Sequence, residues 1–362
     1  MKVAILTCST GGGHNSAGSA IREQLLAGGA DCDLVNALDF MPKLGSDLIS
    51  KGHVLAYKKA PKLYGAVYRF EESHSPKTID LVCAPAAGKL YPFLCERGYD
   101  TVICVHVFPA VMMTHIRAEQ EQSFRSYFVA TDYTCSPGVE MTRMDGYFIP
   151  KELKQEFMQC GLPEDKLVET GIPVHASCYE TLEKAAARRA LGLDPEMRQV
   201  VLSCGSMGCG PMRSLSLFLA KELPEDAGLT VICGSNRRLK RDLAILKHKK
   251  RVRVLGFTDR MPLWLHAADV LLSKPGGLTS TEAMTIGVPL ICINAVPGCE
   301  TRNRQFFVRR GLAATANHVP GLVEQTLSLL DDPEQCRTMT QRQRETFAQP
   351  AAELIAKEVF RA

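Results

Sequence analysis

The sequence predicts an α/β protein in which two doubly wound parallel sheets face a central cleft. Three observations lead to this expectation. The chain has 362 residues, more than one hydrophobic core usually serves. Short β-branched runs alternate with longer helical patterns, which is typical of parallel sheets. The alternation then restarts in the second half, with a glycine-rich turn after its first strand. Ligands of such sheets bind at the carboxyl ends of the strands.

Each half contains a series of expected strands. Those of the first half are Val3–Thr7, Asp33–Asn36, Thr101–Val105, Ser126–Ala130 and Tyr147–Ile149. Those of the second half are Val200–Ser203, Leu229–Cys233, Val252–Leu255, Val270–Leu272 and Leu290–Ile293. A first helix is expected from about Asn15 to Leu26, closed by a glycine pair. We place one domain at residues 1–172 and the next at 173–344, followed by a charged helical tail.

Composition excludes several classes of protein. A hydrophobic content of 46% and a charged content of 23% are ordinary for a folded chain, and a net charge of +4 predicts no nucleic-acid partner. The 14 cysteines lie in apolar stretches without C-x-x-C spacing, which favours free thiols in a reducing cytoplasm and no zinc site. No run reaches the roughly 18 apolar residues of a membrane span, so any membrane contact is from one side.

In each half of the chain, one glycine-rich loop follows the first strand. In Thr10–Ser16, three glycines precede His14, which would sit at a helix start and could accept a proton near neutral pH. The alternative is a tight turn with an incidental histidine. In Cys204–Gly210, main-chain amides and Ser206 could hold a phosphate. Neither loop has the spacing of a P-loop or of a dinucleotide fingerprint, which argues against a kinase and an oxidoreductase.

A third loop, Ser273–Ala283, carries the most specific pattern. Gly276 and Gly277 would present amides, and the helix that begins near Leu278 would point its positive end at a diphosphate. Glu282 would accept bonds from both ribose hydroxyls. The alternative is a glycine turn before a helix with a solvated glutamate.

A fourth loop, Val296–Asn303, should stand beside the third at the same sheet edge. There Glu300 and Asn303 share a helix face and suit sugar hydroxyls.

The third and fourth loops together resemble the family of monogalactosyldiacylglycerol synthases and bacterial processive diacylglycerol glucosyltransferases. The resemblance covers nearly the whole chain. Its further motifs are Gly11–His14 (GGGH), Thr131–Tyr133 (TD-aromatic), Glu169–Val174 (TGIP), and Val254–Met261 with Trp264, which would enclose the uracil.

The resemblance implies a GT-B fold and an inverting, metal-independent transfer of a hexose from a UDP-sugar to a lipid acceptor, diacylglycerol in the first place. It implies no cofactor. His14 would be the catalytic base and Asp132 would assist it. The donor would be bound by Gly205, Ser206, Phe257, Met261, Gly276, Gly277, Thr279, Glu282, Glu300 and Asn303. The acceptor side would include Gly12, Gly13 and His106. A C-terminal helix at about residues 345–362 would pack back on the first domain.

Two departures from the family leave the substrates open. Cys299 stands where the family has glutamine, so both glucose and galactose remain as donor sugars. Ser136 stands where the family has histidine, on the acceptor side. The basic and aromatic stretch 41–70 suits an anionic membrane surface, or equally a core-packing helix pair. The resemblance favours the membrane, and hence a cytoplasmic protein peripheral to the cytoplasmic membrane face.

Two other functions stay open. A UDP-sugar epimerase of the same fold would convert the donor without any lipid. A non-catalytic nucleotide-sugar-binding protein would bind UDP and lose nothing when His14 is replaced. The number of sugars added and the oligomeric state are also open.

Overall fold

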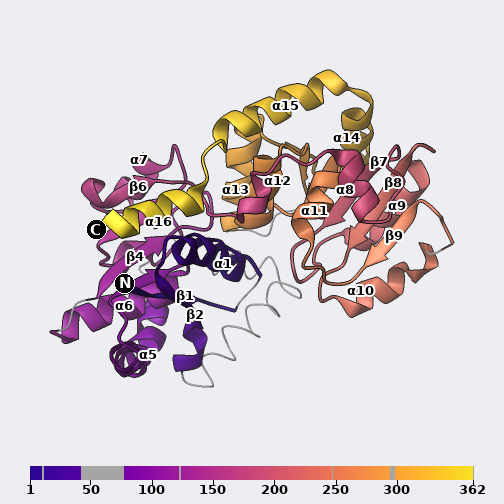
Figure 1. Ribbon diagram of the computed structural model, residues 1–362. Coiled ribbons are helices and arrows are strands. Elements are labelled where there is room, and N and C mark those ends of the chain that lie inside the picture. The colour runs from indigo at the N-terminus through magenta and orange to yellow at the C-terminus, as the bar shows by residue number, and fades with distance from the viewer. Residues whose placement is uncertain (10–11, 42–76, 122–123, 247, 294–297, 362) are drawn as a thin grey trace. The chain divides into compact units, whose positions relative to one another are not determined.

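A computed structural model of the chain describes residues 1–9, 12–41, 77–121, 124–246, 248–293 and 298–361. The stretch 41–70, where we expect membrane contact, lies outside the described residues from residue 42 on. The chain forms two compact units (Figure 1). The first consists mainly of Met1–His175 with Gln349–Ala362, and the second consists of Ala176–Ala295 with Glu300–Ala348. Each unit contains one six-stranded parallel sheet, which confirms the expected fold class.

The first sheet has the strand order β2-β1-β3-β4-β5-β6. Its strands are β1 (Lys2–Thr7), β2 (Asp31–Asn36), β3 (Thr101–Cys104), β4 (Arg125–Val129), β5 (Gly146–Ile149) and β6 (Leu167–Glu169). Leu6 of β1 pairs with Cys104 of β3, which pairs with Phe128 of β4, so these three strands end level with one another. The order reverses between β1 and β3, and this reversal is where parallel sheets bind ligands.

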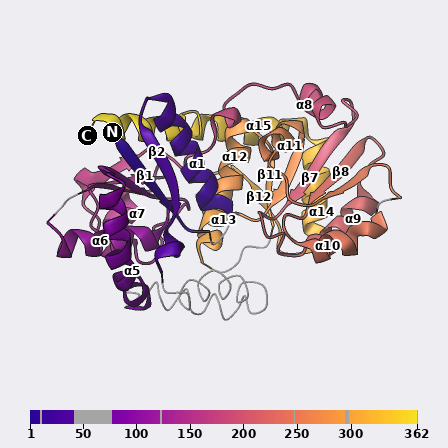
Figure 2. The same cartoon turned by 60° about the horizontal axis from the view of Figure 1, so that its bottom comes forward.

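Helices cover both faces of the first sheet. They are α1 (Gly12–Ala27), α5 (Lys77–Glu96), α6 (Val107–Glu119), α7 (Lys154–Gln159) and α16 (Ala351–Arg361). The C-terminal α16 lies beside α1, far away in sequence (Figures 1 and 2). Ile355 and Val359, one helical turn apart, are fully buried in the same core as Val3 and Ile5 of β1. Each such side chain stabilises the unit by about 1.5–3 kcal/mol.

The second sheet repeats this plan in the order β12-β11-β10-β7-β8-β9. Its strands are β7 (Arg198–Ser203), β8 (Ala227–Ile232), β9 (Val252–Leu255), β10 (Val270–Ser273), β11 (Leu290–Cys292) and β12 (Ala314–Thr315). Here the order reverses between β7 and β10. The turns that follow these two strands are Cys204–Gly210 and Lys274–Gly277. The topology therefore puts the second and third glycine loops side by side at a position suited to a ligand.

The helices of the second unit are α8 (Lys184–Ala190), α9 (Met212–Glu222), α10 (Arg237–Asp242), α11 (Met261–Ala267), α12 (Gly277–Ile286), α13 (Cys299–Arg309), α14 (Val319–Asp331) and α15 (Pro333–Thr346). The start of α15 is fixed by Asp332, whose carboxylate accepts the N–H groups of Glu334 and Gln335. Gly287 ends α12 in a left-handed conformation, with φ of 83°.

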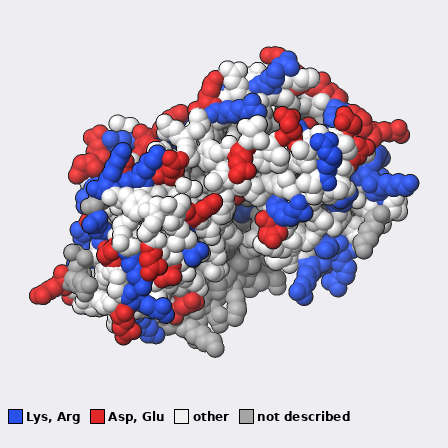
Figure 3. All heavy atoms as spheres, in the orientation of Figure 1, with Lys and Arg blue, Asp and Glu red and all other residues white. Residues whose placement is uncertain are grey.

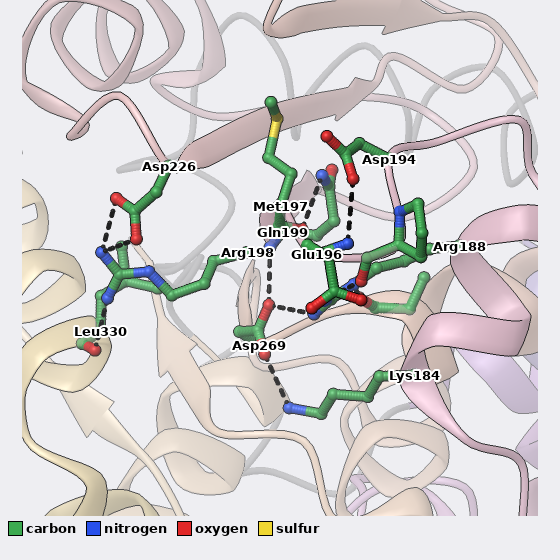
Figure 4. Close-up of polar contacts among 12 residues, drawn as sticks. Lys184, Arg188, Asp194, Glu196, Met197, Arg198, Gln199, Asp226, Asp269 and Leu330 are labelled. Carbon is green, nitrogen blue, oxygen red and sulfur yellow. Dashed lines mark hydrogen bonds and ion pairs between the residues drawn. The ribbon is translucent and has the colours of Figure 1, made fainter.

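An ion cluster around the buried Arg188 fastens α8 to the amino ends of β7 and β10 (Figure 4). Asp269, just before β10, accepts hydrogen bonds from the Arg188 guanidinium and from Lys184 Nζ, the latter at 2.9 Å. It also accepts the main-chain N–H of Gln199 at 2.6 Å. Arg188 is only 6% exposed and also donates to two main-chain carbonyls. The cluster lies at the opposite ends of the strands from the glycine turns, so it stabilises the unit rather than forming part of a ligand site.

Charged side chains of both signs are interspersed over the face shown in Figure 3, and basic ones gather around α10. The exposed Arg237, Arg238, Lys240 and Arg241 account for this concentration.

Candidate active site

The residues expected in the site fall into two groups, one in each unit. His14 belongs to the first group. It lies in the first turn of α1, directly after β1, and its Nδ1 is 2.9 Å from the Val105 carbonyl oxygen and 3.2 Å from Thr131 Oγ1. A carbonyl oxygen can only accept a hydrogen bond, so Nδ1 carries the proton. The lone pair of the neutral ring is then on Nε2, as a general base requires.

Gly12 and Gly13 are the first residues of α1. The first N–H groups of a helix have no acceptor within the helix, and the helix dipole makes this end positive. The structure thus places both glycines, expected on the acceptor side, in the same turn as His14.

His106 lies beside His14, although it follows a different strand. It follows β3 and caps α6, since its Nδ1 accepts the Phe108 N–H at 3.1 Å. Its ring centroid lies 4.6 Å from that of His14, with an angle of 75° between the ring planes. The two imidazoles therefore touch edge to face.

Asp132 follows β4 and is half-buried. Its neighbour Thr131 is the residue that contacts His14. The loop is held by Glu156 of α7, whose carboxylate oxygen accepts Thr134 Oγ1–H at 2.6 Å and the Cys135 N–H at 2.8 Å. The first group of residues is thus gathered from the carboxyl ends of β1, β3 and β4.

In the second unit, the turn after β7 interlocks with the turn after β8. A Cβ atom on Gly208 would lie 2.1 Å from the Cys233 carbonyl oxygen, and one on Gly234 would lie 2.3 Å from that of Ser206. The Ser235 N–H donates to this Ser206 oxygen at 2.7 Å. Both glycines also have positive φ, 54° and 57°. The sequence pattern had suggested a phosphate cradle, and the structure shows in addition that these glycines let two main chains pack together.

Lys274 was not predicted to have a role, and its side chain joins the two glycine loops. Its Cε lies 3.0 Å from the position of a Cβ on Gly205 and 3.7 Å from that of one on Gly276. Its ammonium group is 2.7 Å from Glu300 Oε1. The Lys274 and Glu300 side chains are 23% and 12% exposed, so the pair is largely shielded from water. A lysine at a strand end, separated by one proline from a glycine pair, is the signal that could have identified it.

The third loop begins α12 at Gly277, with Gly276 as its extended N-cap residue. The Gly276 N–H donates to the Lys274 carbonyl at 2.8 Å, so the outward amides of this helix start are those from Gly277 on. Thr279 is half-buried in the first turn. Glu282, in the second turn, is 6% exposed. Burial first, and the Glu282 carboxylate second, raise the pKa of the Cys178 thiol, which places these two side chains near each other.

The fourth loop attaches to the third through its side chains. Asn303 is fully buried on α13, and its Nδ2 donates to the Pro275 carbonyl at 3.0 Å. Glu300 holds Lys274. Of these two residues, both expected to bind the sugar, Asn303 therefore also fixes the main chain before Gly276, and Glu300 fixes the side chain of Lys274.

The two residues expected around the uracil, Phe257 and Met261, lie nearer the edge of the second sheet than the glycine loops do. Phe257 is 71% exposed in the loop after β9, the edge strand. Met261 is half-buried and begins α11, one turn before the buried Trp264. Gly205 and Ser206 are in the turn after β7, near the centre of the sheet.

Within the described part of the chain, no group of three or more metal-ligating side chains is close enough to hold an ion. Among the same residues, no helix combines the length and the apolar character needed to cross a bilayer.

Comparison with known families matches each unit separately. Residues 14–174 match the monogalactosyldiacylglycerol (MGDG) synthase family, and residues 213–346 match the glycosyl transferases group 1 family. A processive diacylglycerol beta-glucosyltransferase of Staphylococcus saprophyticus is 27% identical over 347 residues, which cover 94% of this chain and 87% of the relative.

Solved structures show the same fold at low sequence identity. The glycotransferase of kitacinnamycin has a TM-score of 0.67 at 15% identity, and the alignment covers 99% of this chain and 98% of that one. A putative UDP-N-acetylglucosamine 2-epimerase from Listeria monocytogenes has a TM-score of 0.66 at 13% identity, over 99% and 94% of the two chains. These likenesses confirm the GT-B fold. The chain therefore has the GT-B fold and is a glycosyltransferase, with a first unit that matches the MGDG synthase family and a second that matches the glycosyl transferases group 1 family.

Proposed function

We propose that this glycosyltransferase moves a hexose from a UDP-sugar to diacylglycerol at a membrane surface, with inversion and without a metal ion. The observation that carries the proposal is the tautomer of His14, because transfer to a hydroxyl needs a base and the Val105 carbonyl keeps the proton on Nδ1 and the lone pair on Nε2. The acceptor class is supported by the match to the MGDG synthase family, which begins at this histidine, and by the diacylglycerol glucosyltransferase that the chain resembles.

In this reaction His14 Nε2 takes the proton of the acceptor hydroxyl. The hydroxyl oxygen attacks the anomeric carbon from the side opposite the diphosphate, the bond from that carbon to the diphosphate oxygen breaks, and UDP leaves with the electron pair. The protonated His14 still donates from Nδ1 to the Val105 carbonyl, so the same contact serves both charge states. Thr131 Oγ1 is a second polar neighbour of that nitrogen.

The leaving diphosphate gains negative charge that must be stabilised. The amides at the start of α12 and the Lys274 ammonium supply positive charge at the reversal between β7 and β10. Glu282, Glu300 and Asn303 would recognise the ribose and the sugar. A fixed cation and a helix N-terminus together perform the task that a divalent metal performs in other transferases.

The test is incubation of the protein with UDP-glucose or UDP-galactose and vesicles that contain diacylglycerol, followed by mass analysis of the lipids. We expect a hexosyl diacylglycerol from one donor, with a β linkage by NMR and an undiminished rate in EDTA. Conversion of the donor sugar without lipid would instead indicate an epimerase. UDP binding without any product would indicate a binding protein.

The matched variants are His14→Ala and His175→Ala. His14→Ala should lower kcat by about a hundredfold to ten-thousandfold and leave UDP affinity unchanged. His175 lies in the same unit and pairs at 3.3 Å with Glu23, in the second half of α1 rather than in the turn that carries His14, so its replacement should leave kcat near that of the wild type. Equal rates for the two variants would contradict the assignment of the base.

A further inference from the structure

His106 has the opposite proton arrangement from His14. The Phe108 main-chain N–H donates to His106 Nδ1 at 3.1 Å, so this nitrogen carries a lone pair. The proton of the neutral ring is then on Nε2. In His14 the Val105 carbonyl keeps the proton on Nδ1 and the lone pair on Nε2. Two neighbouring residues after β3 are thus involved in both tautomers. The Val105 carbonyl fixes that of His14, and the cap of α6 fixes that of His106.

The two rings are in contact, with centroids 4.6 Å apart. An oxygen that accepts from one imidazole and donates to another must lie within about 3 Å of a nitrogen of each ring, so the two rings have to be neighbours, as these are. A hydroxyl is the group that matches the pair, because it both donates and accepts hydrogen bonds.

We propose that His106 Nε2–H donates to the oxygen of the acceptor hydroxyl and holds it on His14 Nε2. The inference rests on the proposed function and adds to it the group that positions the nucleophile. His106 keeps its proton throughout the reaction, while His14 takes the proton of the hydroxyl. The donated bond leaves one lone pair of the oxygen for attack on the anomeric carbon and fixes the direction in which the hydroxyl proton points.

One substitution can separate the two roles of His106, which are capping of α6 through Nδ1 and the proposed hydrogen bond from Nε2–H to the acceptor oxygen. Asparagine is a good N-cap residue, so in His106→Asn its side-chain oxygen can accept the Phe108 N–H in place of Nδ1. Its side chain is shorter and lacks the Nε2–H. His106→Ala loses both functions. His318 provides a matched control, since its Nδ1 caps α14 by accepting the Gly321 N–H at 3.0 Å, in the other unit.

We expect His106→Asn to unfold at the same urea concentration as the wild type and to have a kcat about tenfold to a hundredfold lower, with unchanged affinity for UDP. His318→Asn should retain both stability and kcat. His106→Ala should lose stability as well as kcat. A wild-type kcat in His106→Asn would overturn the proposal and leave His106 as a helix cap only.

NMR of the ¹⁵N-labelled imidazoles tests the same inference without turnover. We expect the proton of His106 on Nε2 and that of His14 on Nδ1 in the wild-type protein. A proton on Nδ1 of His106 would overturn the proposal even if glycolipid is formed. Absence of glycolipid from the wild type with both expected tautomers present would count against the proposed acceptor, and the geometry of the histidine pair would stand.

Discussion

Replacing Asp269 with alanine should lower the urea midpoint of the second unit by about 1–2 M. The carboxylate accepts hydrogen bonds from Arg188, Lys184 and the Gln199 main chain, and its own side chain is 21% exposed. Its removal leaves the Arg188 guanidinium, which is 6% exposed, without its counter-charge. Removing one partner of a buried pair costs about 3–5 kcal/mol, and partial exposure of Asp269 favours the lower end. With an m-value of about 2 kcal/mol/M, this gives the stated shift.

Tryptophan fluorescence is the assay, because the chain has one tryptophan. Trp264 is 5% exposed on α11, which packs against α8, the helix that carries Arg188. Its emission therefore reports unfolding of the second unit at the place where the ion cluster acts.

The matched control is Asp226→Ala. Asp226 pairs with Arg198 at 2.8 Å at the same end of the sheet, and its side chain is 63% exposed. Water screens this pair, so the midpoint should remain close to that of the wild type. Equal midpoint shifts for Asp226→Ala and Asp269→Ala would refute the reasoning from burial.

Three further predictions follow from the second unit and the buried thiols. Lys274→Met should weaken UDP binding by about tenfold or more in calorimetry, since a charge-assisted hydrogen bond is lost, and an unchanged Kd would remove this lysine from the donor site. Gly208→Ala should destabilise the protein much more than Gly210→Ala, because both have positive φ but only the former brings a Cβ within 2.1 Å of a carbonyl oxygen. Similar melting temperatures would contradict this. Burial raises the pKa of Cys83 and of Cys292 from 9.0 to about 12, so their stabilisation is complete below pH 9 and is lost as the pH rises towards 12. At pH 10 the loss is about 1.4 kcal/mol for each thiol, measured by urea unfolding against pH, and constant stability from pH 8 to 10 would disprove it.

The fold could be predicted from the sequence for the central strands and also for the edge strand β9, in which three of the four side chains are apolar. Val252–Leu255 was predicted to the residue, and the other predicted strands differ from the observed ones by at most two residues at either end. Parallel strands covered on both faces are continuous apolar runs, which is a strong local signal. The edge strands β6 and β12, three and two residues long, were not predicted, because pairing with a neighbour rather than local pattern defines them.

The strand–helix turns that carry the expected site residues were predictable, and the contacts of these residues were not. Glycines before His14 and before the start of α12 mark two strand–helix turns in the sequence. The proton position in His14 depends on a main-chain oxygen 91 residues away, for which no side-chain pattern exists. The Lys274–Glu300 pair likewise joins residues 26 apart, and only the sheet order brings them together.

The use of a main-chain oxygen to orient His14 has a consequence for how this protein can change. A carboxylate partner can be removed by a single codon change, but every amino acid at position 105 keeps its carbonyl. A mutant library at that position should therefore retain the orientation of the base wherever β3 still folds. Selection for new acceptors can vary the surrounding side chains freely while the proton-accepting nitrogen stays in place.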